Sequence, residues 1–209
     1  MRITEPMTMA TDLVLACLGA LFAYRLWRDR PQSSRRSARL LAAAMASMAL
    51  GAATGGISHG LRLTVGETAD AILWKVTVYS VGLMAFFFVA STALSSLQER
   101  ARRLLLWLAT AQLLGYWWWM LNHDAFLYVI YDYVPAMSIV LVIQLWELRR
   151  GRASAAWISA GVVLSFIGAA VQQSGLTLHR HFNHNDLYHV VQMVAVWLLY
   201  KGGRSLHDR

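Results

Sequence analysis

Histidine, aspartate and asparagine side chains are concentrated in residues 179–190, which read His-Arg-His-Phe-Asn-His-Asn-Asp-Leu-Tyr-His-Val. Asp186 lies three positions and Asn185 lies four positions before His189. Residues at these spacings share one face of an α-helix. Imidazole and carboxylate groups are the usual protein ligands of a catalytic zinc ion that keeps one position open for water. The segment therefore predicts a metal site at the start of a helix.

His184 can join His189 in one ligand set only under one condition. It lies five positions earlier, and so about 140° around an ideal helix from His189. The two imidazoles can meet when His184 lies at or before the helix N-terminus, and Asn183 or Asn185 as the N-cap residue allows this arrangement. The third protein ligand is thus left open between His184, Asn185 and Asp186.

Two further candidates lie at the same predicted membrane depth. His59 closes the second apolar stretch of the chain and Asp70 opens the third, on the side of the membrane where residues 184–189 lie. Ionisable groups within membrane helices are costly and often functional, and a bundle can bring these helix ends together without moving any residue across the bilayer. We predict His59 and His189 as zinc ligands, completed by His184 or Asp186.

The chemistry predicted from these residues is the activation of water. A bound zinc ion lowers the pKa of its water and polarises a carbonyl group. In this hypothesis Asp70 holds or deprotonates the water. Ser58 or Thr54 donates a hydrogen bond to the developing oxyanion.

The scaffold that positions these residues is predicted to be a helix bundle in a membrane. Of the 209 residues 57% are hydrophobic and only 14% are charged, whereas soluble domains contain about 25% charged residues. This composition excludes a disordered chain, and the single cysteine, Cys17, excludes a disulfide framework. We predict one all-α domain over residues 1–209, a bundle of seven transmembrane helices. The apolar stretches span residues 9–28, 39–59, 69–93, 103–122, 125–147, 154–173 and 186–202.

The positive charges predict how the bundle is oriented. Most of the 19 Lys and Arg residues follow the first, third, fifth and seventh stretches. These cations are Arg25, Arg28, Arg30, Arg35, Arg36, Arg39, Arg100, Arg102, Arg103, Arg149, Arg150, Arg152, Lys201, Arg204 and Arg209. The opposite side has only Arg2, Arg62 and Arg180. The positive-inside rule then places the N-terminus outside and the C-terminus in the cytoplasm.

This distribution also indicates location and partners. The net charge of +8 is assigned to topology and to contacts with lipid head groups, not to nucleic acid. We expect a multi-pass protein of a cell membrane, the bacterial inner membrane, with a membrane lipid as substrate or ligand. The short gap at residues 122–124 fits either two full spans or a tight re-entrant turn.

The candidate site resembles that of the CREST-like superfamily of seven-helix membrane hydrolases, which includes alkaline ceramidases, progestin/adiponectin receptors and Per1-like proteins. That pattern has Ser-xxx-His late in helix 2, an Asp early in helix 3 and His-xxx-His at the start of helix 7. His59, Asp70 and His189 match its helix-2 histidine, its helix-3 aspartate and its second helix-7 histidine. The resemblance implies zinc held by histidines and a lipid amide or ester as substrate.

The sequence departs from this pattern at two positions. The first helix-7 histidine falls on Asn185, with His184 next to it, and the helix-2 serine falls on Gly55, with Thr54 and Ser58 nearby. The acidic calcium site near the N-terminus of the ceramidases is not evident, and a ceramide substrate is not specifically supported.

The function predicted first is zinc-dependent hydrolysis of a lipid amide or ester by a metal-activated water. The alternative is a non-enzymatic seven-helix receptor or ligand-binding membrane protein that retains a partial metal site. A haem-carrying protein is disfavoured because the histidines lie at helix ends. A retinal protein is disfavoured because Lys201 lies at the end of the last apolar stretch. The oligomeric state is left open.

Overall fold

The computed structural model describes residues 3–28 and 36–209, and within this part of the chain seven α-helices account for nearly all regular structure. They overlap all seven apolar stretches, which confirms the predicted all-α class with seven helices. Arg2, Arg30 and Arg35 lie outside the described residues. The helices are α1 (Pro6–Arg28), α2 (Arg36–Val65), α3 (Glu67–Ser96), α4 (Glu99–Met120), α5 (Phe126–Arg149), α6 (Ala153–Ser174) and α7 (His184–Gly203).

Five of these helices, α1, α2, α3, α5 and α6, are long and apolar enough to cross a membrane. A span of about 30 Å needs about 20 residues at 1.5 Å each. This supports a multi-pass membrane protein, with five candidate spans where the sequence predicted seven. The two other helices both begin with polar residues, Glu99 and three nearby arginines in α4 and His184, Asn185 and Asp186 in α7.

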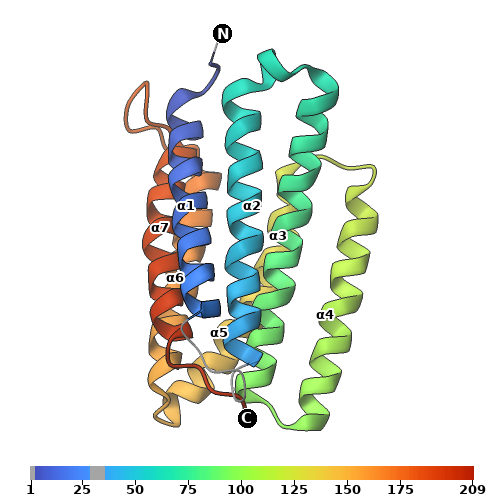
Figure 1. Ribbon diagram of the computed structural model, residues 1–209, viewed down its shortest axis with the longest axis vertical. Coiled ribbons are helices and arrows are strands. Elements are labelled where there is room, and N and C mark those ends of the chain that lie inside the picture. Colours follow the sequence, from blue (N-terminus) through green and yellow to red (C-terminus); the bar gives the residue numbers. More distant parts are fainter. Residues whose placement is uncertain (1–2, 29–35) are drawn as a thin grey trace.

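Six helices form a closed ring, and α4 stands outside it. Around the ring the order of packed neighbours is α1, α2, α3, α5, α6, α7 and back to α1, whereas α4 packs mainly on α3 and touches α5 only sparsely. Figure 1 shows α4 at one side of the bundle, beyond α3. Residues 121–125 separate α4 from α5, so the gap at 122–124 joins two separate helices of 22 and 24 residues.

The two ends of the bundle differ in charge. We call the end at which α1, α3, α5 and α7 begin the N-terminal end, and the end at which they finish the basic end (Figure 1). The basic end holds the described cations of the links and tail, including Arg28, Arg102, Arg149 and Arg204. The orientation of these ends relative to a membrane stays a prediction.

The C-terminal tail is tied to the basic end. The Asp208 carboxylate accepts hydrogen bonds from the backbone N–H groups of Arg36 and Ser37, at 2.8 and 2.9 Å, and from the Ser37 hydroxyl at 2.6 Å. The backbone N–H of Arg209 donates to the Leu94 carbonyl at 3.0 Å. Because the first N–H groups of a helix have no partner within the helix, Asp208 acts as a cap for α2.

Small residues allow α1 to approach α2 near the N-terminal end. A Cβ atom added at Gly56 would lie 2.8 Å from Cβ of Asp12, closer than real side chains pack. Gly56 is buried against α1, and Gly55 is buried between α1 and α3. The close helix contact brings the carboxyl group of Asp12 into the interior of the ring, where it forms part of the candidate site.

Candidate functional site

A cavity of about 180 Å³ lies inside the ring, near the N-terminal end. Side chains from all six ring helices line it, and none of its lining residues comes from α4. Its walls are mainly apolar, with Leu15, Met48, Val81 and Met84 on α1, α2 and α3. Its polar groups include Asp12, His59, Thr77, Ser165, Gln172, Asn185, His189 and Gln192, besides the hydroxyls of Tyr133 and Tyr188. The cavity thus combines an apolar lining with polar side chains that are buried, such as Asp12 and His189, or partly buried, such as His59.

His189 lies at the centre of the polar part and is held by two residues of α1. Its Nε2 atom lies 3.1 Å from Oδ1 of Asp12, and its Nδ1 atom lies 2.9 Å from Oγ1 of Thr11. Only 6% of His189 and 5% of Asp12 are exposed. A buried imidazole with both nitrogens engaged is held in one orientation, because either contact would be lost if the ring turned.

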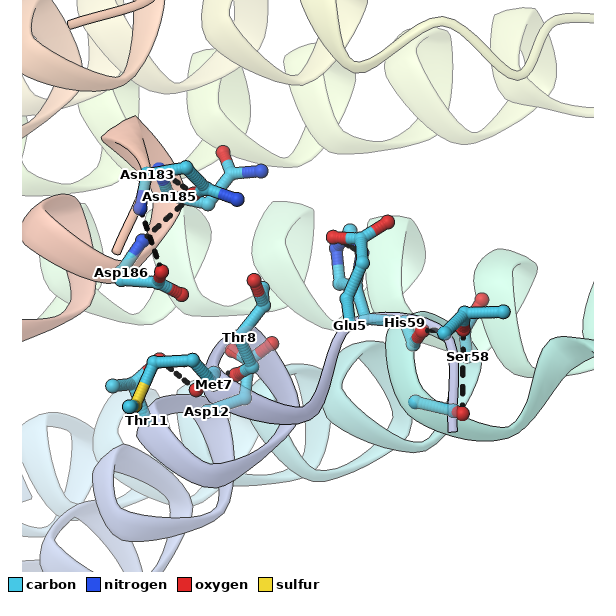
Figure 2. A network of polar contacts seen from close by, with 12 residues as sticks. Glu5, Met7, Thr8, Thr11, Asp12, Ser58, His59, Asn183, Asn185 and Asp186 are labelled. Atoms are coloured by element: carbon cyan, nitrogen blue, oxygen red, sulfur yellow. Dashed lines mark hydrogen bonds and ion pairs between the residues drawn. The ribbon is translucent and has the colours of Figure 1, made fainter. Parts of the chain in front are cut away.

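The Thr11 hydroxyl constrains the protons of His189. Its oxygen lies 3.1 Å from the carbonyl oxygen of Met7 and 3.0 Å from that of Thr8 (Figure 2). A hydroxyl has one proton, and when Thr11 donates it to one of these carbonyls, its oxygen accepts from Nδ1–H of His189. Nε2 then faces the carboxyl group of Asp12, and one proton lies between them.

A second imidazole–carboxylate pair lies at the same end of the bundle. Nδ1 of His59 lies 3.2 Å from Oε2 of Glu5, and both side chains are partly exposed. Figure 2 shows Glu5 between His59 on one side and Asp12 on the other. Glu5 and Asp186 lie close enough to Asp12 for their charges to act on it, and His59 lies similarly close to His189. The two pairs therefore belong to one acidic, histidine-containing region.

Ser58 and Asp70, which were predicted as the oxyanion donor and the general base, are hydrogen-bonded to each other. The Ser58 hydroxyl donates to Oδ1 of Asp70 at 2.6 Å, linking the end of α2 to the start of α3. Neither residue lines the cavity. The pair fastens two neighbouring helices where they begin and end. The Thr54 hydroxyl similarly contacts Oγ1 of Thr77 at 2.8 Å.

The start of α7 is fixed by a capping box. The Asn183 side chain accepts hydrogen bonds from the backbone N–H groups of Asn185 and Asp186, at 2.8 and 3.3 Å. In return, Oδ2 of Asp186 accepts from the backbone N–H of Asn183 at 2.8 Å (Figure 2). Asn183 is thus one of the two N-cap residues that the sequence proposed, and His184 is the first residue of the helix. Oδ1 of Asp186 and Nδ1 of His184 are buried and have no hydrogen-bond partner among the described residues.

The predicted zinc ligands do not form one cluster. His189 contacts Thr11 and Asp12, His59 contacts Glu5, and one oxygen of Asp186 belongs to the cap. Within residues 3–28 and 36–209, no group of three or more His, Cys, Asp and Glu residues could hold a metal ion. The donor set as arranged does not fit the zinc site that the resemblance implies. Zinc stays a prediction.

The site residues near the start of the chain were not predicted from the sequence. Thr11 and Asp12 hold His189, and Glu5 holds His59, although none of them was a candidate. One signal was available, because Asp12 is an acidic residue inside the apolar stretch 9–28, and such residues are functional candidates by default.

The chain matches the model of a known protein family. A family described as "Family of unknown function (DUF6962)" matches residues 7–208, which is nearly the whole chain. No curated protein and no solved structure matches the sequence.

Proposed function

We propose that this chain, which belongs to the DUF6962 family, binds a lipid-like molecule inside its helix ring, with the polar group of the ligand at Asp12 and His189. One observation carries the proposal: a cavity with apolar walls, enclosed by six helices, has a buried imidazole–carboxylate pair among its lining residues. Ligand sites in proteins combine an apolar lining with a few convergent polar groups in this way.

The charges of the site favour a ligand without an anionic head group. Asp12 lines the cavity, and Glu5 and Asp186 lie close to it. An anion in this region would be repelled by carboxylates, and no arginine or lysine lines the cavity within the part of the chain that the structure describes. An amide, ester or hydroxyl group can instead exchange hydrogen bonds with Asp12, His189 and Gln192.

The size of the cavity limits how much of the ligand it holds. Its volume of about 180 Å³ is below the ~300–1,000 Å³ of pockets for drug-sized ligands. It therefore suits a polar group with the adjoining part of a hydrocarbon chain, and the rest of the chain extends out between helices. We place the protein in the bacterial inner membrane. We orient the N-terminal end of the bundle to the outside, because the basic residues gather at the opposite end.

Hydrolysis of a lipid amide or ester is the second candidate, and the Asp12–His189 pair favours it. A positioned imidazole beside a carboxylate is a common general acid–base arrangement in acyl transfer. In this proposal the shared proton rests on Nε2 of His189, and the Asp12 carboxylate takes the proton of a water molecule that attacks the ligand carbonyl and returns it to the leaving group. The imidazolium form of His189 keeps Asp12 ionised until that proton arrives.

Filling the cavity tests the binding proposal. Ala169 of α6 lines the cavity, whereas its neighbour Ala170 is exposed on the outside of the same helix. We expect lipids that co-purify with the wild-type protein, identified by mass spectrometry of an extract, to be lost from Ala169→Trp and retained in Ala170→Trp. Equal lipid content in the two folded variants would contradict the proposal.

The hydrolase proposal has a separate test. Purified protein is incubated with a panel of lipid amides and esters, and released fatty acid is measured. Release by the wild type that disappears in His189→Gln supports hydrolysis, whereas bound but intact lipid leaves the protein a binding protein. Zinc analysis of the same samples tests the metal prediction, because stoichiometric zinc must then be lost from the His59→Ala/His189→Ala variant.

A further inference from the structure

A second hollow, of about 600 Å³, lies at the basic end between α4 and α5. It exists because α4 stands outside the ring and touches α5 only sparsely. Residues 96–98, at the end of α3 and the turn that follows, lie at one end of it, and Ala101 of α4 lies on one side. Val142, Leu145 and Trp146 of α5 form the other side. We call this hollow the α4–α5 groove.

The walls of the groove on α5 are apolar and accessible. Val142 is 67% exposed and Trp146 is 57% exposed, although both belong to a helix that is apolar enough to span a membrane. Within a bilayer such side chains face hydrocarbon and not water. A groove with these walls is therefore suited to an acyl chain.

Arginine side chains lie at the basic end of the same groove. Arg149, Arg150 and Arg209 line it, together with one carboxylate, that of Glu147. Glu147 is 4% exposed and lies 3.4 Å from Nη1 of Arg150 and 3.8 Å from Nη1 of Arg209. A single buried carboxylate thus faces more than one guanidinium group, and the lining keeps a positive charge.

Of these three arginines, Arg149 and Arg150 are the most accessible to a ligand. Arg149 is exposed and has no ion pair among the residues that the structure describes. Arg150 has a side chain that is 45% exposed, and its guanidinium lies 5.0 Å from the ring centre of Trp146. Arginine binds phosphate oxygens in a bidentate manner while its planar group rests on an aromatic ring.

We propose that the α4–α5 groove binds an anionic phospholipid, with an acyl chain along Val142 and Trp146 and the phosphate at Arg149 and Arg150. Basic pockets between membrane helices at the cytoplasmic side bind anionic head groups. The groove differs in chemistry from the central cavity, which has no lysine or arginine among its lining residues. The proposal does not depend on the function of that cavity.

Lipid titration of the full-length protein in detergent, followed by native mass spectrometry, tests this proposal. The probes are phosphatidylglycerol, which is anionic, and phosphatidylcholine with the same acyl chains. We expect the wild type to retain phosphatidylglycerol about tenfold more strongly. Arg149→Gln is expected to abolish that preference, because one charge-assisted contact to phosphate is lost.

The matched control is Arg103→Gln. Arg103 is 71% exposed, pairs with Glu99 at 2.6 Å and does not line the groove, so this variant removes one charge from the same end of the protein. We expect it to keep the preference. Ala101→Trp fills the groove without changing charge and is expected to weaken retention of phosphatidylglycerol. If Arg149→Gln fails to fold, Ala101→Trp tests the proposal in its place.

Three results would overturn the proposal. The first is equal retention of the two lipids by the wild type. The second is equal behaviour of Arg149→Gln and Arg103→Gln. The third is full displacement of phosphatidylglycerol by millimolar inorganic phosphate, because a site for the phosphate group alone would not need the apolar groove.

Discussion

The two ends of the bundle each bury a carboxylate, but they surround it differently. At the N-terminal end Asp12, 5% exposed, has His189 as its ionisable partner and lines a cavity. At the basic end Glu147, 4% exposed, lies within 3.4 Å of nitrogens of Arg150 and Arg152. Arginine is always charged, whereas the charge of a histidine depends on its surroundings.

The difference indicates that Glu147 is a structural carboxylate and that Asp12 is suited to function. The charge of Glu147 is compensated under all ordinary conditions, so its pairs hold the ends of α5 and α6 and the tail together. Asp12 has no permanent cation, and its contacts with His189 can be exchanged for contacts with a ligand in the cavity. We therefore expect changes at Glu147 to affect stability, and changes at Asp12 to affect ligand retention.

The largest effect is expected from Glu147→Ala. Removing one partner of a buried ion pair lowers the free energy of unfolding by about 3–5 kcal/mol. Because the arginines here are partly exposed, we expect a loss of about 3 kcal/mol. Thermal unfolding in detergent should show the loss. Glu99→Ala is the control, because Glu99 is half exposed and its pairs with Arg102 and Arg103 are worth about 1 kcal/mol or less. A similar loss in both variants would remove the distinction between buried and surface pairs.

A smaller loss is expected from Gly56→Ala, which disturbs the Asp12 end alone. The added Cβ would lie 2.8 Å from Cβ of Asp12, and such overpacking costs about 1–3 kcal/mol. Gly115→Ala on α4 has nothing within 4 Å and should stabilise the helix by about 0.5–1 kcal/mol. Opposite signs in thermal unfolding are the expected outcome, and a neutral Gly56→Ala would mean that α1 and α2 can separate freely.

Asp12→Asn should change ligand retention more than stability. The amide has the size of the carboxyl group and keeps one hydrogen bond to His189, but it cannot accept a proton. We expect retention of co-purified lipid to fall about tenfold, equivalent to ~1.4 kcal/mol. If the unfolding temperature falls as far as in Glu147→Ala while lipid content is unchanged, the two carboxylates do not differ in the proposed way.

The smallest effect is expected from Thr11→Val. This change removes one hydrogen bond to His189, worth about 1 kcal/mol, and keeps the shape of the side chain. The ¹⁵N resonances of the His189 ring should then show a mixture of tautomers in place of one, because Nδ1 has lost its partner. Unchanged resonances would show that Asp12 alone fixes the ring.

Features of the fold that depend on residues close together in the sequence could be predicted. Features that depend on which helices pack side by side could not. Apolar runs predicted seven helices, and Asn183 was one of two predicted caps of α7. The contact between Thr11 and His189 joins residues 178 positions apart and needs α1 beside α7. Hydrophobic periodicity does not specify which helices are neighbours. For the same reason, nothing in the sequence indicated that α4 stands outside the ring.

The cap that Asp208 provides to α2 has a consequence for the order of assembly. Asp208 follows Arg36 by 172 residues, which at ~5–20 residues per second is about 10–30 s of synthesis. During that time α1 and α2 can pair while the first N–H groups of α2 lack this acceptor. The cap is thus one of the last native contacts to form, and protection of the Ser37 amide from hydrogen exchange would report the moment at which the bundle is complete.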